Sequence, residues 1–534
     1  MPTAAEIDAL NPWLVHVEFR RVQTYLFAVP RLRAMLGANS LVGVLLHGTL
    51  PTLLRSYETL DLSALAPAVM TPVVGDPLAA NDQPRAQLAN GILARDGGHF
   101  EAVFANEAAA RGFATAARQK IGADLPGLLF DLHVQRLAAE PSRDRPAPVS
   151  ATLVELPHFQ TCDVSGNGIA VGEVVLGRED VPRVSEAAKR RFEQGERFAR
   201  GDTLDWVGQL DCHLPCRHAE PPTELAKIGG HDYLAIVHAD GLRIGQRAAG
   251  AGHAEGIQGR VDAMAFFARM RSAVRSALVA AMHATFGAST RDVRPFQLMM
   301  LGGDDLLLAC RAPDALPFVR NYALALSDAT RHLTDDQPLF VNAGVVISRP
   351  TVPFYRLHAI AETLASSAKR LARGLTADAS TVDWTVFSGA WSDDPIAQRQ
   401  QHAIRKVEGT TLVLSGRPLP TLGVGLDTLS GLIDKATHLN ASRPARSQLR
   451  GLVDALARGE HEARLVFAGL PSETHKALAS IGVTAPWEPI PPAADWRLSR
   501  LADLIEVYEI ERLGRARPDD AATTPPPAQP AEAQ

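Results

Sequence analysis

Residues 299–310, MMLGGDDLLLAC, constrain the fold of this chain more than any other stretch. Two glycines and two aspartates stand there between two strongly apolar runs, residues 296–301 and 306–310. Apolar runs of this length on either side of a turn signal predict two buried strands joined by a tight hairpin. Asp and Gly are ordinary turn formers, which is the structural explanation. Adjacent carboxylates at a strand end are also two oxygen ligands for a hard divalent cation, which is the chemical explanation.

The segments around this hairpin alternate between the periodicities of strands and helices. The expected elements are a strand over residues 232–240, a helix over 261–286, the hairpin, a helix over 315–333, a strand over 339–347 and a helix over 355–373. A ferredoxin-like split βαβ arrangement has this order. In such a sheet the first strand lies beside the hairpin, so its terminal residue Asp240 is expected close to Asp304 and Asp305.

Three carboxylates at one edge of a sheet repel one another unless cations lie between them. Magnesium suits such a place, because it binds one or two carboxylates together with substrate phosphates. Two Mg²⁺ or Mn²⁺ ions held by Asp240, Asp304 and Asp305 would follow the two-metal logic of polymerases. Gly302 and Gly303 would leave room for phosphates to approach the backbone. A polar hairpin with an unrelated upstream aspartate is the alternative.

Composition sets the broad class. A chain of 534 residues with 46% hydrophobic and 21% charged residues is typical of a soluble globular protein with about two to four domains. No apolar run approaches membrane-spanning length, and the N-terminus lacks the features of a signal peptide. Four cysteines make no disulfide framework, which favours a cytoplasmic location. The net charge of -5 gives no reason to expect broad nucleic-acid binding, although a local basic groove is compatible with it.

A possible structural zinc site lies in the irregular middle of the chain. Cys212 and Cys216 fall in CHLPC, with His218 close behind. Cys162 could supply a fourth ligand, and a structural zinc takes four N or S ligands in a tetrahedron. The paired C-x-x-C spacing is absent, so a lost site with leftover cysteines is the alternative. Cys310 follows an apolar strand and is expected in the core.

Three motifs together carry a family resemblance: HADG at 238–241, GGDD at 302–305 and VNAGVVIS at 341–348. This segment resembles the second palm domain of the large, polymerase-like subunit of type III CRISPR effector complexes. The GGDEF diguanylate cyclases are more distant relatives of that domain. The resemblance implies that Lys369, on the helix after the last palm strand, contacts phosphate; a solvated helix face is the alternative. Asn342 and Ser348 would flank the central strand and reach a base.

The N-terminal part resembles the first palm of the same subunit, through residues 13–27 and 30–42, with residues 95–106 in the place of its hairpin. It departs from the active pattern. His99 and Phe100 stand where two aspartates would be. His16 and Glu18 replace the strand-end aspartate. This palm is therefore expected to bind little or no catalytic metal. The resemblance implies that it faces the active palm and helps hold a second nucleotide. The family's HD nuclease is missing, because the pair at 231–232 lacks the further spaced His and Asp.

The expected fold is α/β (α+β) with two ferredoxin-like palm domains. The expected divisions are a degenerate first palm at 1–149, an intervening region with a possible zinc element at 150–230, an active palm at 231–375, a mostly helical docking domain at 376–516 and a disordered tail at 517–534. The boundary near 150 rests on the Pro-rich stretch 141–149, and the tail has no apolar residues to bury.

The resemblance implies a nucleotidyltransferase that condenses ATP into a 3′–5′ linked, cyclic oligoadenylate signal in antiviral defence. Guide RNA and other subunits of an effector complex would be its partners, and no membrane is involved. Two other functions stay open. One is a scaffold subunit of an RNA-guided complex whose palm binds nucleotide without turning it over, and the other is a diguanylate-type cyclase that uses GTP.

Overall fold

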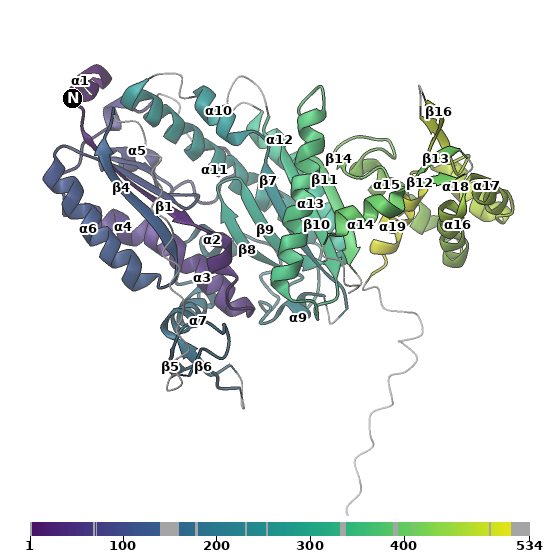
Figure 1. Cartoon of the computed structure of the whole chain (residues 1–534), viewed down its shortest axis with the longest axis horizontal. Helices are drawn as coiled ribbons and strands as arrows, with labels where there is room; N and C mark the ends of the chain where they lie inside the picture. Colours follow the sequence, from purple (N-terminus) through teal and green to yellow (C-terminus); the bar gives the residue numbers. More distant parts are fainter. Residues whose placement is uncertain are drawn as a thin grey trace, which may run out of the picture.

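A computed structural model describes residues 3–67, 70, 72–138, 160–176, 180–229, 232–251, 255–331, 338–387, 394–407, 409–490 and 493–513. The Pro-rich boundary at 141–149 and the tail at 517–534 lie outside these residues. The described chain is a mixed α/β structure with several sheets, in which two larger sheets lie side by side and a smaller helical part follows at one end (Figure 1).

The first sheet has four strands in the order β2-β3-β1-β4. Its strands are β1 (Trp13–Arg20), β2 (Ile92–Ala94), β3 (His99–Phe104) and β4 (Leu129–Arg136). The helices near it are α1 (Ala4–Leu10), α2 (Val22–Leu26), α3 (Leu32–Val44), α4 (Leu50–Leu54), α5 (Pro84–Ala89) and α6 (Glu107–Asp124), with a π-helical turn at Leu45–Thr49 and a 3₁₀ turn at Ser63–Leu65. The central strand β1 is antiparallel to both β3 and β4, as in a split βαβ unit.

The second sheet has six strands in the order β14-β11-β10-β7-β9-β8. They are β7 (Leu234–Gly241), β8 (Phe296–Gly302), β9 (Asp305–Arg311), β10 (Val341–Ser348), β11 (Thr381–Phe387) and β14 (Leu419–Pro420). The inner order β10-β7-β9-β8 has the strand neighbours expected from the sequence. Strand β11 is parallel to β10 and extends the same sheet, so the boundary expected at 375 divides one sheet.

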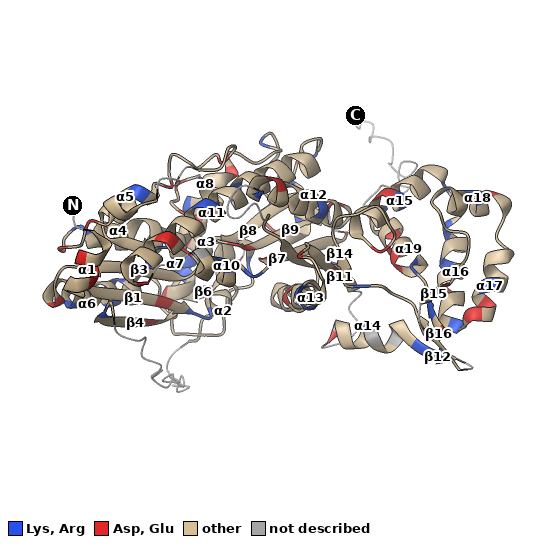
Figure 2. Cartoon of the chain, turned by 90° about the horizontal axis from the view of Figure 1, so that it is seen from above, with Lys and Arg blue, Asp and Glu red and all other residues tan. Residues whose placement is uncertain are grey.

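Helices cover both faces of the second sheet. They are α10 (Ile244–Ala251), α11 (Gly256–Phe286), α12 (Ala312–Thr330) and α13 (Phe354–Gly374). Helices α11 and α12 lie on one face and α13 on the other (Figure 2). Burial on both faces explains why the inner strands are continuous apolar runs rather than alternating ones. At Gly344 a β-carbon would lie 2.0 Å from the Ala361 carbonyl oxygen of α13, so only glycine permits this close packing.

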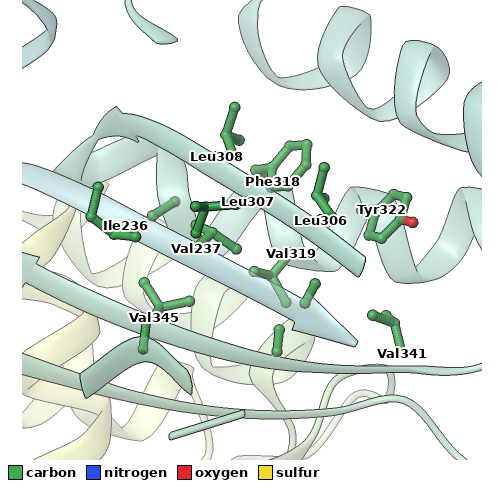
Figure 3. Close-up of a cluster of buried hydrophobic side chains, with 14 of the residues drawn as sticks. Ile236, Val237, Leu306, Leu307, Leu308, Phe318, Val319, Tyr322, Val341 and Val345 are labelled. Carbon is green, nitrogen blue, oxygen red and sulfur yellow. The ribbon is translucent and has the colours of Figure 1, made fainter. Parts of the chain in front are cut away.

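The core of the second sheet is aliphatic with a few aromatic rings from α12. The side chains labelled in Figure 3 are all buried: Ile236, Val237, Leu306, Leu307, Leu308, Phe318, Val319, Tyr322, Val341 and Val345. Strands β7 and β9, which carry the candidate aspartates at their ends, are thus fixed by the largest apolar cluster of the molecule. Hydrophobic burial positions this end of the sheet.

The region between the two sheets packs against both of them: one helix lies against α3 of the first part, and two short helices lie against strands of the second sheet. It contains β5 (Ala170–Glu173), β6 (Arg183–Ser185), α7 (Glu186–Ala199), α8 (Trp206–Asp211) and α9 (Leu225–Gly229). Helix α7 crosses α3 at two glycines: a β-carbon at Gly37 would lie 1.8 Å from the Arg191 carbonyl oxygen, and one at Gly195 would lie 2.2 Å from that of Arg33. Within the described residues, Leu32–Leu54 is the one stretch apolar and long enough to cross a membrane, and over half of it is buried, as in a core helix.

The C-terminal part contains more than the expected helices. Its helices are α14 (Pro395–Ala403), α15 (Leu429–Ser442), α16 (Arg446–Arg458), α17 (Glu460–Ala468), α18 (Ser472–Ser480) and α19 (Leu501–Ile510). A four-stranded sheet lies beside them, built from β12 (Ile404–Val407), β13 (Thr410–Val413), β15 (Glu488–Ile490) and β16 (Ala493–Leu498). Its strands are short and come from segments far apart in the chain, which explains why the sequence pattern missed them.

Helix α13 also joins the two larger sheets through a buried histidine. The ring of His358 lies 4.7 Å from that of Phe27, which follows α2, and 5.6 Å from that of His238 on β7. Burial, and secondarily His238, lowers the pKa of His358 from 6.5 to about 4. Between these values the unfolded chain binds a proton that the folded chain does not. The contribution to stability is therefore complete above pH 6.5 and is lost as the pH falls toward 4.

Replacing His358 by Phe should weaken the dependence of the unfolding free energy on pH below 6.5, because phenylalanine keeps a buried ring of similar shape but does not titrate. The pKa difference corresponds to about 3 kcal/mol of unfolding free energy. Melting temperatures at pH 7.5 and 4.5 measure this, and the variant should lose less stability than the wild type. The exposed His438→Phe is the control and should keep the wild-type slope. An unchanged slope in His358→Phe contradicts the assignment.

Candidate functional site

The GGDD motif forms the predicted hairpin with the shortest common turn. Gly302 pairs with Asp305 across β8 and β9, so Gly303 and Asp304 are the two central residues. Gly303 has φ 71°, and Asp304 is not among the residues with positive φ. A positive φ at the first central position alone is typical of a type II′ turn, which requires glycine there. The turn therefore explains Gly303, but it places no demand on the two carboxylates.

Strand β7 brings Asp240 to this hairpin. Ala239 pairs with Leu306 on β9, and Asp240 pairs with Asn342 on β10. The strand that ends at Asp240 is thus the direct neighbour of the strand that begins at Asp305. The structure brings Asp240, Asp304 and Asp305 together as the sequence predicts, and the polar turn with an unrelated upstream aspartate does not describe this arrangement.

The electrostatics of the three aspartates follow from their crowding. Burial first, and then the charges of Asp240 and Asp304, raise the pKa of Asp305 to about 7. Burial and Asp240 also raise the pKa of Asp304. A hydrogen bond between the Asp305 and Asp240 carboxyl groups adds to the shift at Asp305. Strongly shifted carboxyl groups in a cleft are a common sign of a functional site.

Lys369 supplies the positive charge of the site. Its ammonium group on α13 forms an ion pair and hydrogen bond with one Asp240 carboxylate oxygen, and both side chains are partly exposed. The sequence predicted a phosphate contact or a solvated helix face for this lysine. In the described structure its ammonium group lies beside Asp240, where a bound metal ion would compete with it.

One glycine of the site was missed by the sequence analysis. A β-carbon at Gly241 would lie 2.7 Å from the Asp304 Oδ2 atom and 2.9 Å from its Cβ. The Gly241 backbone N–H also lowers the pKa of Asp304, partly offsetting burial. The sequence signal was the glycine directly after Asp240 in HADG. By contrast, a β-carbon at Gly302 would meet no atom within 4 Å, so that side of the hairpin is open.

The predicted base contacts of Asn342 and Ser348 are wrong for this structure, because both side chains are fully buried. Asn342 donates to the Asp240 carbonyl oxygen at 3.4 Å and accepts from Thr381 at 2.9 Å, so it braces the strand. Ser348 pairs with Leu234 at the other end of β10, about 20 Å along the strand from Asn342.

The hairpin opens into a cleft of about 430 Å³ that lies between the two larger sheets. Asp304 and Asp305 line one side, and Gly97 and Gly98 of the first hairpin line the other. A larger hollow of about 670 Å³ lies between α11 and α12, but it has no cluster of carboxylates. The smaller cleft is therefore the better candidate for chemistry.

The first hairpin lacks a comparable acidic pair. Phe100 is fully buried in the core, and His99 stacks on His16 with ring centroids 5.6 Å apart. Glu18 pairs with His99 across the strands. The carboxylate that precedes the glycines, Asp96, is engaged elsewhere.

Asp96 belongs to a buried charge network that joins the first hairpin to α11. It accepts from His47 Nε2 at 2.8 Å and from Trp206 Nε1 at 2.9 Å, and it lies 3.1 Å from an Arg271 nitrogen. Arg271 also binds Asp82, whose other ion pairs are formed with Arg95 and Arg275. Despite burial, these arginines lower the pKa of Asp82 to about 2. No pattern in the sequence indicated this network.

The predicted zinc site is not assembled. Cys162 lies in a small apolar cluster with Val184 and Phe192. Cys216 donates to the Phe286 carbonyl oxygen at 3.2 Å, whereas Cys212 is exposed. His218 is exposed as well. Each sulfur atom thus packs locally or donates to a nearby backbone carbonyl oxygen, and the cysteines do not converge on one metal position.

More generally, in the part of the chain that the structure describes, no three or more His, Cys, Asp or Glu side chains are grouped so that they could hold a metal ion. Among the three aspartates, one Asp240 carboxylate oxygen is ion-paired with Lys369. Binding of a cation there requires that pair to open. The oxygen donors themselves are of the type that Mg²⁺ and Mn²⁺ prefer.

Comparison with known proteins gives distant structural likenesses only. No family model and no curated protein sequence matches the chain. Among solved structures, an apo Csm1-Csm4 cassette has 12% identity and a TM-score of 0.45, covering 94% of this chain and 70% of that one. A Csm1-Csm4 cassette in complex with cA4 gives the same values. Csm1 of T.onnurineus has 12% identity and a TM-score of 0.44, with 95% and 70% covered. At this distance, ligands and activities do not transfer to this chain.

The crowding of carboxylates makes a prediction for the metal-free protein. Folding raises the pKa of Asp305 from 3.8 to about 7, so its ionisation destabilises the fold above pH 7 and has no effect below about pH 4. Asp305→Asn should therefore raise the unfolding free energy by on the order of 2 kcal/mol at pH 8 in EDTA, and by little at pH 4. Denaturant titration at both pH values measures this. Asp328→Asn, exposed on α12, serves as the control, and equal stability at pH 8 would place the carboxylates apart.

Proposed function

We propose that this chain is a metal-dependent nucleotidyltransferase that condenses ATP into a cyclic oligoadenylate, acting as a palm-type subunit of a type III CRISPR-like effector complex. The observation that carries the catalytic part is the convergence of Asp240 with Asp304 and Asp305 at the mouth of a cleft. The choice of ATP, and of the complex, is supported by the resemblance of HADG, GGDD and VNAGVVIS to that family.

The donor set fits a pair of divalent cations. All three side chains supply hard oxygen ligands, and they come from adjacent strands whose positions the core fixes. Burial first, and then the neighbouring carboxylate charges, raise the pKa values of Asp304 and Asp305. Bound Mg²⁺ or Mn²⁺ would activate a ribose hydroxyl and neutralise charge on the triphosphate.

The other residues of the cleft have separate roles in positioning the carboxylates and holding the nucleotide. Asp240 is held from its backbone by Asn342 and ion-paired through its side chain with Lys369. When Asp240 is occupied by a cation, the Lys369 ammonium is released and can bind a phosphate oxygen. Gly302 presents no side chain and no close neighbour, which leaves room for the triphosphate. The glycines of the first hairpin line the opposite wall, where a second nucleotide would be held.

One observation favours a second candidate, a scaffold subunit that binds nucleotide without turnover. Lys369 already neutralises the Asp240 carboxylate within the protein. An ammonium group cannot replace a metal ion in activating a ribose hydroxyl. If that pair never opens, the cleft would bind nucleotide weakly and catalyse nothing. The two candidates differ in whether metal addition produces turnover.

Replacing both Asp304 and Asp305 by Ala should abolish product formation from ATP in the presence of Mg²⁺ or Mn²⁺. The loss should be about a thousandfold or more, because the metal-binding charges contribute several kcal/mol in the transition state. Asp240→Ala should behave alike. Products are identified by mass spectrometry after incubation with each NTP separately, which also distinguishes ATP from GTP use.

The control is His99→Ala in the first hairpin, which removes an exposed ring and should reduce activity far less. Circular dichroism and the melting temperature show whether each variant is folded. Undiminished turnover in a folded double variant would falsify the two-metal assignment. Absence of any product from the wild type with every NTP and both metals would favour the scaffold function.

A further inference from the structure

A second groove lies beside the catalytic cleft, on the other side of α2. It has a volume of about 560 Å³ and is formed by the end of β1, the residues before β4 and the first turn of α7. Arg21 and Thr24 line both the groove and the cleft at the GGDD hairpin. The two spaces are therefore separated only by a short segment of chain, and a ligand can extend from one to the other.

A buried arginine at this groove has no anionic partner. Arg191 on α7 is only 4% exposed and lines the groove. Its guanidinium stacks 4.2 Å from the centre of the Tyr25 ring, but its Nε has no hydrogen-bond partner. A buried cation without a carboxylate is costly, and no carboxylate of the described residues pairs with Arg191. This donor set is complete only with an anion.

Two further features add positive potential to the same groove. The N-terminal turn of the 14-residue helix α7, residues 185–188, lines it, and helix N-termini attract phosphate groups. Arg21 is exposed, has φ 51° and forms no ion pair within the described part of the chain. The remaining charges are already paired: Arg20 with Asp131, and Glu186 of the groove with Arg190.

Three exposed aliphatic side chains also line the groove. Leu129, Ile169 and Val171 line it with 50%, 41% and 62% of their surfaces exposed. Exposed aliphatic side chains gathered at one place indicate a surface that a ligand covers. Phosphate-binding groups and exposed aliphatic side chains in one groove match the two halves of a nucleotide, whose base is flat and largely apolar on its faces.

We propose that this groove binds one nucleotide unit of a linear phosphodiester chain whose other end lies in the catalytic cleft. The phosphate takes the side of Arg191, Arg21 and the α7 N-terminus, and the base covers the aliphatic side chains. The inference rests on the proposed function for the identity of the chain, which is then the growing linear oligoadenylate. A single-stranded RNA has the same chemistry and is the competing source.

The test uses a pair of variants on one segment. Val171→Glu places a negative charge in the groove without disturbing the core, because Val171 is mostly exposed. Val175→Glu is the matched control: this valine is 69% exposed, follows on the same segment and does not line the groove. Val171→Lys reverses the sign of the added charge. All three are made in the full chain.

The probe is a fluorescently labelled linear triadenylate with a 5′-triphosphate, and its binding is measured by anisotropy in EDTA at low salt. Val171→Glu should weaken binding about fivefold or more, since one charge near a phosphate is worth about 1 kcal/mol at a surface. Val175→Glu should bind like the wild type, and Val171→Lys should bind at least as tightly. Binding of ATP alone should be similar in all four proteins, because one nucleotide does not reach from the cleft to the groove.

The outcomes separate the two proposals. Equal triadenylate binding by Val171→Glu and the wild type overturns the groove assignment. An effect of Val171→Glu on a mixed-sequence 12-nucleotide RNA, but not on triadenylate, overturns the product as occupant and assigns RNA instead. Triadenylate binding that depends on Val171, in a protein that makes no oligonucleotide, supports the groove and refutes the proposed function. Arg191→Gln, if its melting temperature is retained, should weaken triadenylate binding as well.

Discussion

Two arginines of α11 fix the distance between the two glycine-rich hairpins. Arg271 and Arg275 are buried, and they bind Asp82 and Asp96 of the N-terminal part across the boundary between the larger sheets. Removing one partner of such a buried network typically costs about 3–5 kcal/mol, because the remaining charge is left without water or a counterion. Since Asp96 directly precedes Gly97, the same network sets the wall of the cleft that faces Asp304.

The site could be predicted from the sequence to the extent that it depends on strand order and local turns. Continuous apolar runs around GGDD identified β8 and β9, and the alternation of strands and helices placed the strand of Asp240 beside them. Backbone pairing then brings the carboxylates together whatever the side chains do. The strand orders β2-β3-β1-β4 and β10-β7-β9-β8 could be expected for the same reason. Each depends on the periodicity of apolar residues along the chain rather than on contacts between distant side chains.

What the sequence could not predict depends on distant side chains. The Asp96 network uses residues from four separate segments, and Asp240 meets Lys369 only because α13 crosses the sheet. The residues of the possible zinc site are not brought together in the described structure, because residue type says nothing about convergence: Cys162 is used as a small apolar side chain. The C-terminal sheet was missed since its strands are too short for a pattern to emerge.

The two halves of the carboxylate site differ in how firmly the sheet holds them. Strand β7 lies between β9 and β10 in the sheet, and Asp240 itself is paired with Asn342 of β10, so its backbone is held by the ladder. Asp304 lies in a two-residue turn next to the edge strand β8. Any reorganisation on ligand binding must therefore come from the hairpin and from the rotamer of Lys369. Rearrangement of the site for a ligand is thus expected in the turn from Gly302 to Asp305 and in the Lys369 side chain, while β7 keeps its place in the sheet.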